Sequence, residues 1–395
     1  MPMDKNKRIL ITGLGVVSAA GIGKAESMRA IASGLRNPAP PTLFSSTLEN
    51  PAFEVQDLPG EYRLEGRRTL GLALLAADEA AGEASLDSDS VKGLRVGVCM
   101  GTTVASQLND IDFYRRFRET GDPPLGPVER FLSGDLSECI AGKYGLEGPL
   151  MTVVNACSSS TDAVGVALSW LRSGLCDIAI AGGADELNRV PFCGFSSLGI
   201  MSPEACAPFD RDRKGLNLGE GAGVLVLETE ASALRRGVDS GLFVAGFGAS
   251  ADAYHLTAPH PEGKGLRRAL ELAIREAGIS ASEIAFINAH GTATPENDRV
   301  EGRTLLEIFG PRVKVASTKG YTGHTLGAAG GIEAVFSALA LREGIAPASA
   351  GFENLDEEIG LLPLTENTPL RGNYVLSTSL AFGGNNAALV LGLGG

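Results

Sequence analysis

Cys157 is the residue of this chain best suited to nucleophilic chemistry. It follows an apolar β-type run over 150–154 and precedes a helical pattern over 163–171. This order predicts a strand-to-helix turn with the cysteine at or just before the helix N-terminus, where unpaired backbone N–H groups and the positive dipole end lie. Both favour the thiolate, and a cysteine so placed can have a pKa of roughly 3.5–7.5 rather than about 8.5. The same N–H groups are suited to bind an oxyanion on an attacked carbonyl.

Two of the four histidines follow predicted buried strands. His290 comes after a strand over 284–289, and His324 comes after a strand over 313–317, each in a loop of small polar residues. If the carboxyl ends of these strands meet the cysteine turn, one site contains Cys157, His290 and His324. A cysteine with two histidines suits acyl transfer, because the thiolate attacks a thioester and imidazole N–H groups stabilise the developing negative charge.

Composition limits the class of protein. The 395 residues are 44% hydrophobic and 21% charged, which allows a large core and two or three domain-sized units. A net charge of −13 disfavours nucleic-acid binding. The six cysteines form no C-x-x-C pair, so neither a disulfide framework nor a zinc framework is expected. No apolar run is long enough to span a bilayer, and we expect a cytoplasmic protein.

The order of predicted elements repeats. Strand, turn, reactive residue and apolar helix occur over 153–171 and again over 315–341. The economical interpretation is two copies of one β/α unit, residues 1–240 with the cysteine and residues 241–395 with the two histidines. Alternating strands and helices favour a mixed or parallel sheet that is covered on both faces.

Other site chemistries fit the sequence poorly. The first strand, over 8–12, leads into G-x-G-x-x-S, which lacks the third glycine of the dinucleotide fingerprint, and the glycine-rich stretch over 219–223 lacks G-K-[ST]. No G-x-S-x-G is present for a serine hydrolase. A zinc site made of His290, Asp298, Glu301 and His324 matches no known ligand spacing, so no metal is expected.

Four motifs together resemble a known family. They are Asn155-Ala156-Cys157-Ser158-Ser159, Asn288-Ala289-His290-Gly291-Thr292-Ala293-Thr294, Ser317-Thr318-Lys319-Gly320-Tyr321-Thr322-Gly323-His324 and Phe382-Gly383-Gly384-Asn385-Asn386. They look like signatures of the β-ketoacyl-[acyl-carrier-protein] synthases, specifically the elongating Cys-His-His type (KAS I/II) of the thiolase superfamily. The resemblance covers essentially the whole chain. It implies an α/β thiolase-like fold with duplicated βαβαβαββ halves, five α-β-α-β-α layers, and a homodimer.

The resemblance also implies a reaction in fatty acid elongation. Cys157 would take an acyl chain from acyl carrier protein as a thioester. Malonyl-acyl carrier protein would then lose CO₂ and attack that thioester, a decarboxylative Claisen condensation. His290 and His324 would promote decarboxylation and stabilise the enolate, with Lys319 in a supporting electrostatic role and Glu301 as a structural glutamate.

Further residues follow from the same resemblance. The backbone N–H groups of Cys157 and Phe382 would form the oxyanion hole, and Phe382 would also gate the acyl pocket. Thr292 and Thr294 would bind phosphopantetheine, which arrives on the carrier protein, so no resident cofactor is expected. His255 would be structural. Leu380-Ala381 before Phe382 departs from the family pattern and leaves the mobility of the gate open.

Acyl carrier protein is acidic, so docking requires a local basic patch. Candidate residues for this patch are Arg67, Arg68, Arg115, Arg116, Arg118 and Arg130. A ketosynthase of polyketide or aryl-polyene synthesis would have the same site and remains an alternative. A non-catalytic heterodimer partner would lack Cys157. A thiolase proper would carry a second cysteine in the C-terminal half, and KAS III would have Asn in place of His324.

Overall fold

The computed structural model describes residues 8–87, 90–105 and 110–394. Residues 1–7, 88–89 and 106–109 of the predicted first half, and residue 395 of the second, lie outside the described residues. Ten strands form the main path of one mixed sheet, in the order β4-β3-β5-β6-β1-β7-β13-β12-β8-β9. Their bounds are β1 Ile9–Ser18, β3 Val96–Gly101, β4 Leu150–Val153, β5 Ile178–Asp185, β6 Gly221–Thr229, β7 Leu242–Ala251, β8 Ile284–Asn288, β9 Val315–Ala316, β12 Tyr374–Ala381 and β13 Asn385–Leu393.

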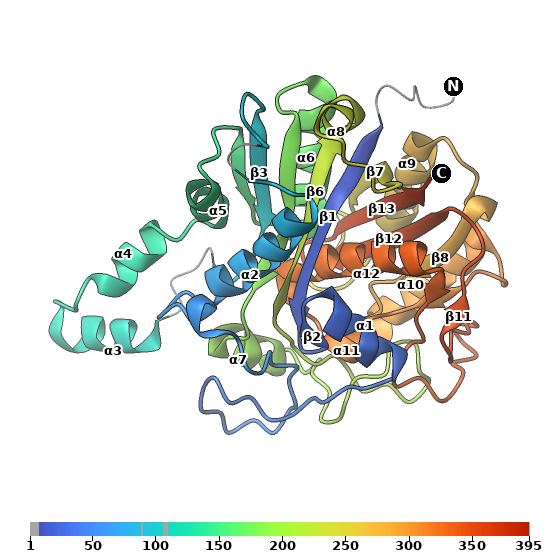
Figure 1. Cartoon of the computed structure of the whole chain (residues 1–395). Coiled ribbons are helices and arrows are strands. Elements are labelled where there is room, and N and C mark those ends of the chain that lie inside the picture. The colour runs from blue at the N-terminus through green and yellow to red at the C-terminus, as the bar shows by residue number, and fades with distance from the viewer. Residues whose placement is uncertain (1–7, 88–89, 106–109, 395) are drawn as a thin grey trace.

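The topology shows the duplication. In each half the third strand lies at the outer edge, followed by the second, fourth, fifth and first. The halves meet where β1 and β7 pair antiparallel over two residue pairs, Ile9 with Val244 and Leu10 with Phe243. In Figure 1 the blue-to-green half and the yellow-to-red half lie on opposite sides of this junction.

Six helices complete five layers. Helices α2 and α5 cover the outer face of the first half, α6 and α12 lie between the two halves of the sheet, and α9 and α10 cover the outer face of the second half. Their bounds are α2 Arg68–Glu83, α5 Leu136–Tyr144, α6 Ser159–Ser173, α9 Lys264–Ala277, α10 Pro295–Phe309 and α12 Ala329–Glu343. Each half therefore has the βαβαβαββ order, and the predicted thiolase-like fold is confirmed.

Hydrophobic patterning explains which layer each helix occupies. In α9, residues Leu266, Ala269, Leu270 and Ala273 are buried at three- and four-residue spacing while the opposite face is polar, as expected for an outer helix. In α12, by contrast, every residue from Ala329 to Leu341 is buried. A helix that is apolar all round belongs between two sheets, where no face meets water.

The first strand differs from its prediction. We expected a strand over 8–12 that leads into the G-x-G sequence, and β1 continues to Ser18 with both glycines inside it. A Cβ on Gly13 would lie 2.0 Å from the carbonyl oxygen of Ala80, and one on Gly15 would lie 1.9 Å from that of Ala76. These glycines therefore allow α2 to pack directly on the strand.

The remaining elements cover the ends and edges of the sheet. They are α1 Lys24–Ala32, α3 Ile111–Thr120, α4 Gly126–Leu132, α7 Arg189–Ser197, α8 Glu230–Arg236, α11 Lys319–Thr322, β2 Gly21–Ile22, β10 Ile345–Ala346, β11 Thr368–Pro369, and the 3₁₀ turns η2 Gly60–Tyr62, η3 Ala281–Glu283 and η4 Leu326–Ala328. Helices α3 and α4 form an arm that projects from the body (Figure 1), and neither helix has a buried residue. Within the described ranges, no helix combines the length and apolar character needed to cross a membrane.

Candidate active site

A tight turn between β4 and α6 carries the cysteine, as predicted. Helix α6 begins at Ser159 with Ser158 as its N-cap residue, so Cys157 lies just before the helix. The backbone N–H of Asn155 donates to Ser159 Oγ at 2.8 Å, and Ser159 Oγ donates to the Ala156 carbonyl at 2.6 Å. Ala156 has φ = 49°, a left-handed conformation that is strained for a non-glycine residue and is typical of functional turns.

One cavity of about 320 Å³ brings the predicted site residues together. Its wall includes Cys157, His290, Thr292, Thr294, His324 and Phe382. The rings of His290 and His324 are perpendicular, at 89°, with centroids 5.2 Å apart. One thiol and two imidazoles thus face a common space, as the convergence of the two halves predicted.

His290 is fixed through its own backbone. Strand β8 ends at Asn288, and the buried carboxylate of Glu301 on α10 closes the loop that follows. Its Oε1 accepts from His290 N–H at 2.8 Å and from Thr378 Oγ at 2.6 Å, while Oε2 accepts from Gly291 N–H at 2.8 Å. Glu301 therefore holds the loop that aims the imidazole, and it does not line the cavity.

We expect Glu301→Gln to lower turnover about 10- to 100-fold, because a 1 Å misplacement of a catalytic group costs up to about 10² in rate. The glutamine NH₂ must face an N–H donor at one of the two oxygen positions, which also costs about 1–3 kcal/mol of stability. The matched control is Glu307→Gln, an exposed glutamate on the same helix. Steady-state rates and urea unfolding measure both effects, and wild-type values for Glu301→Gln would contradict this role.

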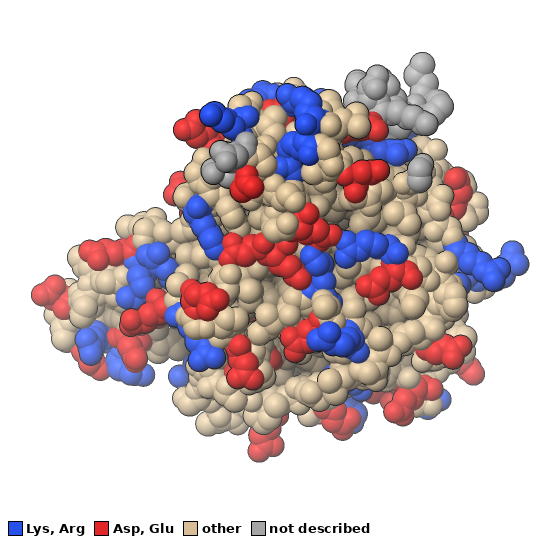
Figure 2. Space-filling model, in the orientation of Figure 1, with Lys and Arg blue, Asp and Glu red and all other residues tan. Residues whose placement is uncertain are grey.

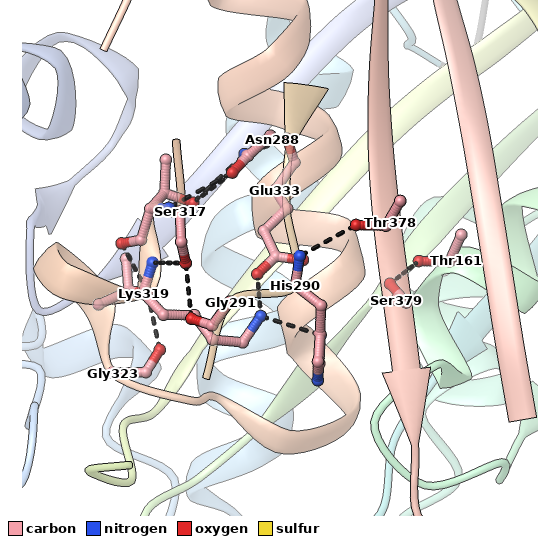
Figure 3. Close-up of polar contacts among 12 residues, drawn as sticks. Thr161, Asn288, His290, Gly291, Ser317, Lys319, Gly323, Glu333, Thr378 and Ser379 are labelled. Atoms are coloured by element: carbon pink, nitrogen blue, oxygen red, sulfur yellow. Dashed lines mark hydrogen bonds and ion pairs between the residues drawn. The ribbon is translucent and has the colours of Figure 1, made fainter. Parts of the chain in front are cut away.

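Lys319 is fully buried and lies beside His290 (Figure 3). Its ammonium donates to Nδ1 of His290 at 3.1 Å and forms an ion pair with Glu333. An ammonium group only donates, so Nδ1 of His290 is an acceptor and its Nε2 carries the proton. This is the imidazole N–H that the predicted chemistry requires.

Both histidines are neutral. Burial and then the charge of Lys319 hold the pKa values of His290 and His324 well below 6.5. A neutral imidazole can donate a hydrogen bond to a developing oxyanion or accept a proton. The pair therefore provides polar groups without bringing further positive charge into the cavity.

The predicted low pKa of Cys157 is wrong for this closed site. Burial raises the pKa of the thiol to about 11, although the charge of Lys319 and the backbone N–H groups of Phe382 and Cys157 act to lower it. Desolvation therefore outweighs the helix terminus. The resting group is a thiol, and it must lose its proton as it attacks.

We accordingly expect alkylation of Cys157 by iodoacetamide to accelerate about tenfold per pH unit between pH 6 and 9, because the thiolate fraction grows in that proportion below the pKa. Intact-mass spectra of wild type and Cys157→Ala, compared at each pH, isolate the reaction of this thiol from that of the exposed Cys193. A rate that levels off below pH 8 would contradict the raised pKa.

Phe382 contributes to the site in two ways. It follows β12 in the turn before β13, and its backbone N–H points at Cys157 Sγ together with the N–H of Cys157 itself. Its ring stacks on Phe195 at 5.4 Å and 14°, and Phe195 in turn meets His324 edge-on at 6.5 Å. Two N–H groups therefore converge where a tetrahedral oxyanion would form, next to the stacked rings of Phe195 and Phe382.

The wall of the cavity includes both predicted threonines. The hydroxyls of Thr292 and Thr294 are 2.9 Å apart and line the wall. His255 lies outside the cavity wall, and its Nδ1 accepts from Thr257 N–H at 3.1 Å and Ala258 N–H at 3.2 Å, which shapes the loop at the mouth. Within residues 8–87, 90–105 and 110–394, no three His, Cys, Asp or Glu side chains are placed to hold a metal.

Two residues that support the site, Glu333 and Phe195, were not among the predicted ones. Glu333 is an acid within the otherwise apolar pattern of α12, a signal that was available. No sequence pattern indicated a role for Phe195 in the site, because aromatic residues are common in protein cores. Arg68, a candidate for the basic patch, donates to the buried carboxylate of Glu220, at 2.8 Å from Nε to Oε2, and lines a second cavity together with the candidates Arg67, Arg115 and Arg130.

Comparison with known proteins agrees with this geometry. Residues 67–233 match the β-ketoacyl synthase N-terminal domain, and residues 243–353 match the β-ketoacyl synthase C-terminal domain. A 3-oxoacyl-[acyl-carrier-protein] synthase 2 of Staphylococcus aureus (strain COL) is 33% identical over 98% of this chain and 99% of its own length.

Solved structures are also similar over nearly the whole chain. The ishigamide ketosynthase/chain length factor has a chain that is 34% identical with a TM-score of 0.92, covering 98% of this chain and 99% of its own. A type II polyketide ketosynthase in complex with its acyl carrier protein is 26% identical with a TM-score of 0.86, covering 98% and 99%. The chain belongs to the β-ketoacyl synthase family. It is an acyl-transferring condensing enzyme of the 3-oxoacyl-[acyl-carrier-protein] synthase type.

Proposed function

We propose that Cys157 accepts an acyl group from acyl carrier protein and that malonyl-acyl carrier protein extends it by two carbons, without a resident metal or cofactor. The observation that carries this proposal is the common cavity of Cys157, His290 and His324, with two backbone N–H groups at the sulfur. Phosphopantetheine would arrive on the carrier, and the hydroxyls of Thr292 and Thr294 in the cavity wall would bind it.

The reaction has two halves. First, Sγ of Cys157 bonds to the acyl carbonyl carbon, the carrier's sulfur leaves, and the thiol proton ends on that leaving sulfur. Next, the malonyl group loses CO₂, and the electron pair of the broken C–C bond becomes an enolate whose oxygen is stabilised by His290 and His324. The enolate carbon then attacks the acyl thioester. Sγ leaves, takes up a proton, and the 3-oxoacyl carrier is released.

The test is turnover of malonyl-acyl carrier protein against a ladder of acyl primers, with products and acyl-enzyme read by mass spectrometry. Saturated 3-oxoacyl products with saturated primers support fatty acid elongation. Absence of acyl-enzyme with every primer would refute the proposal.

A second candidate is polyketide or aryl-polyene synthesis. The similarity to the ishigamide ketosynthase/chain length factor favours it, because its identity of 34% is as high as that to the fatty acid enzyme. Conjugated, unsaturated primers added to the same ladder separate the two, since preference for them would assign the enzyme to this pathway. A non-catalytic partner role is disfavoured by Cys157 and both histidines in one cavity.

Carrier docking is proposed at exposed arginines. Arg116 and Arg118 are exposed on α3, where basic and acidic side chains are interspersed over the arm (Figure 2). Reversal of both charges should raise KM for carrier-bound substrate and leave acylation from a free pantetheine thioester unchanged.

We also propose a homodimer formed along β4, the edge strand of the sheet. Its Leu150 and Met151 are 41% and 45% exposed, and Val154 beyond its end is 55% exposed. An unpaired edge with apolar side chains favours pairing with a second strand. Light scattering should give twice the chain mass, and Met151→Lys should give the monomer; a heterodimer partner would instead be needed if wild type is monomeric.

A further inference from the structure

A hydrogen-bonded chain of side chains joins the two halves beside the cysteine. Asn385, the first residue of β13, donates through Nδ2 to Oδ1 of Asn155 at 2.6 Å. Asn155 donates through its own Nδ2 to Oδ2 of Asp162 on α6 at 2.6 Å, and Ser158 Oγ donates to the same oxygen at 2.8 Å. The carboxylate thus lies at one end and the turn that carries Phe382 at the other.

The direction of this chain is fixed by Asp162. Because Oδ2 of Asp162 accepts from both Asn155 and Ser158, Asn155 turns its NH₂ toward Asp162 and its carbonyl oxygen toward Asn385. Asn385 must then donate. Each amide therefore has one permitted orientation, and that orientation depends on the accepting oxygen of Asp162.

The bond from Asn385 is also distinct from the other hydrogen bonds of the same turn. Gly383 N–H donates to the Leu256 carbonyl at 2.7 Å, and Asp252 N–H donates to the Gly384 carbonyl at 2.7 Å. Both of those bonds hold the turn to its own half. The bond to Asn155 instead holds it to the nucleophile turn, next to the cysteine at which the Phe382 N–H points.

We propose that Asp162, Asn155 and Asn385 form a positioning relay that sets the distance between the Phe382 N–H and Cys157, and so the geometry of the oxyanion hole. The inference rests on the proposed acyl transfer. None of the three side chains has to touch substrate, so they act through the Phe382 turn and the cysteine turn.

The first variant replaces the donor at the Asn385 end of the relay with an acceptor. Asn385→Asp places a second acceptor opposite Asn155, and no orientation of the Asn155 amide then satisfies both carboxylates. We expect the rate constant for acylation of Cys157 by an acyl-pantetheine thioester to fall about 10- to 100-fold, with little change in KM. Asp162→Asn keeps an accepting oxygen where Oδ2 lies, so acylation should stay within about threefold of wild type.

The double variant Asp162→Asn/Asn385→Asp has the charge of wild type and permits a fully flipped Asn155. We expect it to regain at least about tenfold of the acylation rate lost in Asn385→Asp. Asn385→Ala, which removes the donor without adding charge, is the substitute if Asn385→Asp does not fold. Asn367→Ala is the matched control, because Asn367 makes comparable amide hydrogen bonds at an exposed site away from the cavity.

The possible results distinguish failure of the positioning relay from failure of the proposed acyl transfer. Wild-type acylation rates in Asn385→Asp or Asn385→Ala would overturn the relay, as would a double variant no faster than Asn385→Asp. A merely structural role would lower the unfolding midpoint without the rescue of rate by reversed polarity. Failure of wild type itself to form an acyl-enzyme would count against the proposed function instead.

Discussion

Replacing Cys157 with alanine should abolish acyl-enzyme formation and lower condensation by about 10³-fold or more, the scale seen when a nucleophile is removed. In the described structure, Cys157 is the cysteine that lines the cavity, and the remaining five lie elsewhere. No second thiol is therefore placed to replace it. Intact mass after incubation with an acyl-pantetheine thioester should show one added acyl group on wild type and none on the variant.

Two comparison variants make this result specific. Cys193→Ala removes an exposed thiol and should acylate like wild type. His290→Ala keeps the nucleophile and should still form acyl-enzyme, but condensation should fall about 10²- to 10⁴-fold, the usual contribution of an acid–base group. Full acylation of Cys157→Ala would refute the assignment of the nucleophile, and unchanged condensation in His290→Ala would refute the role of that imidazole.

The convergence of the site was predictable because it follows from periodicity. Strand, turn and apolar helix recur in both halves, so the ends of matching strands had to meet, and Cys157 and His324 precede the two central helices α6 and α12. The side chain of Phe382 is not reactive, so its role was predicted only from the resemblance of its motif to the family.

Other features depend on tertiary distance, which the sequence does not contain. The pKa of Cys157 depends on how completely the cavity removes water, and that is set by residues far along the chain such as Phe195. The ion pair between Arg68 and the buried Glu220 joins positions far apart in the sequence, so no local pattern could predict it. Gly13 and Gly15 lie inside a strand, and the sequence does not show that α2 packs directly on them.

The largest effect on stability is expected at the buried ion pair of Lys319 and Glu333, next to His290. Lys319 and Glu333 are each 2% exposed, and Glu333 Oε2 has no hydrogen-bond partner among the described residues. Burial raises the pKa of Glu333 to about 7, against the opposing effect of Lys319. Lys319→Met removes that opposing charge, leaves a buried acid without its partner, and should destabilise the fold by about 3–5 kcal/mol.

The free energy of unfolding of Lys319→Met should fall, relative to wild type, as pH rises. A carboxyl whose pKa is raised on folding binds its proton more tightly in the folded state, so it costs stability as pH rises from its unfolded value toward and through the folded one. Without Lys319 the pKa of Glu333 should rise further, and the deficit of Lys319→Met should be larger at pH 8 than at pH 6. Urea unfolding at the two pH values measures this difference.

A double variant separates stability from catalysis. Lys319→Met/Glu333→Leu removes both buried charges and should recover most of the lost stability, because an apolar replacement of a buried ion pair is often neutral or stabilising. It should not recover condensation, since His290 Nδ1 still lacks the ammonium that fixes its proton on Nε2. Recovery of both properties would mean that Lys319 serves only to neutralise Glu333.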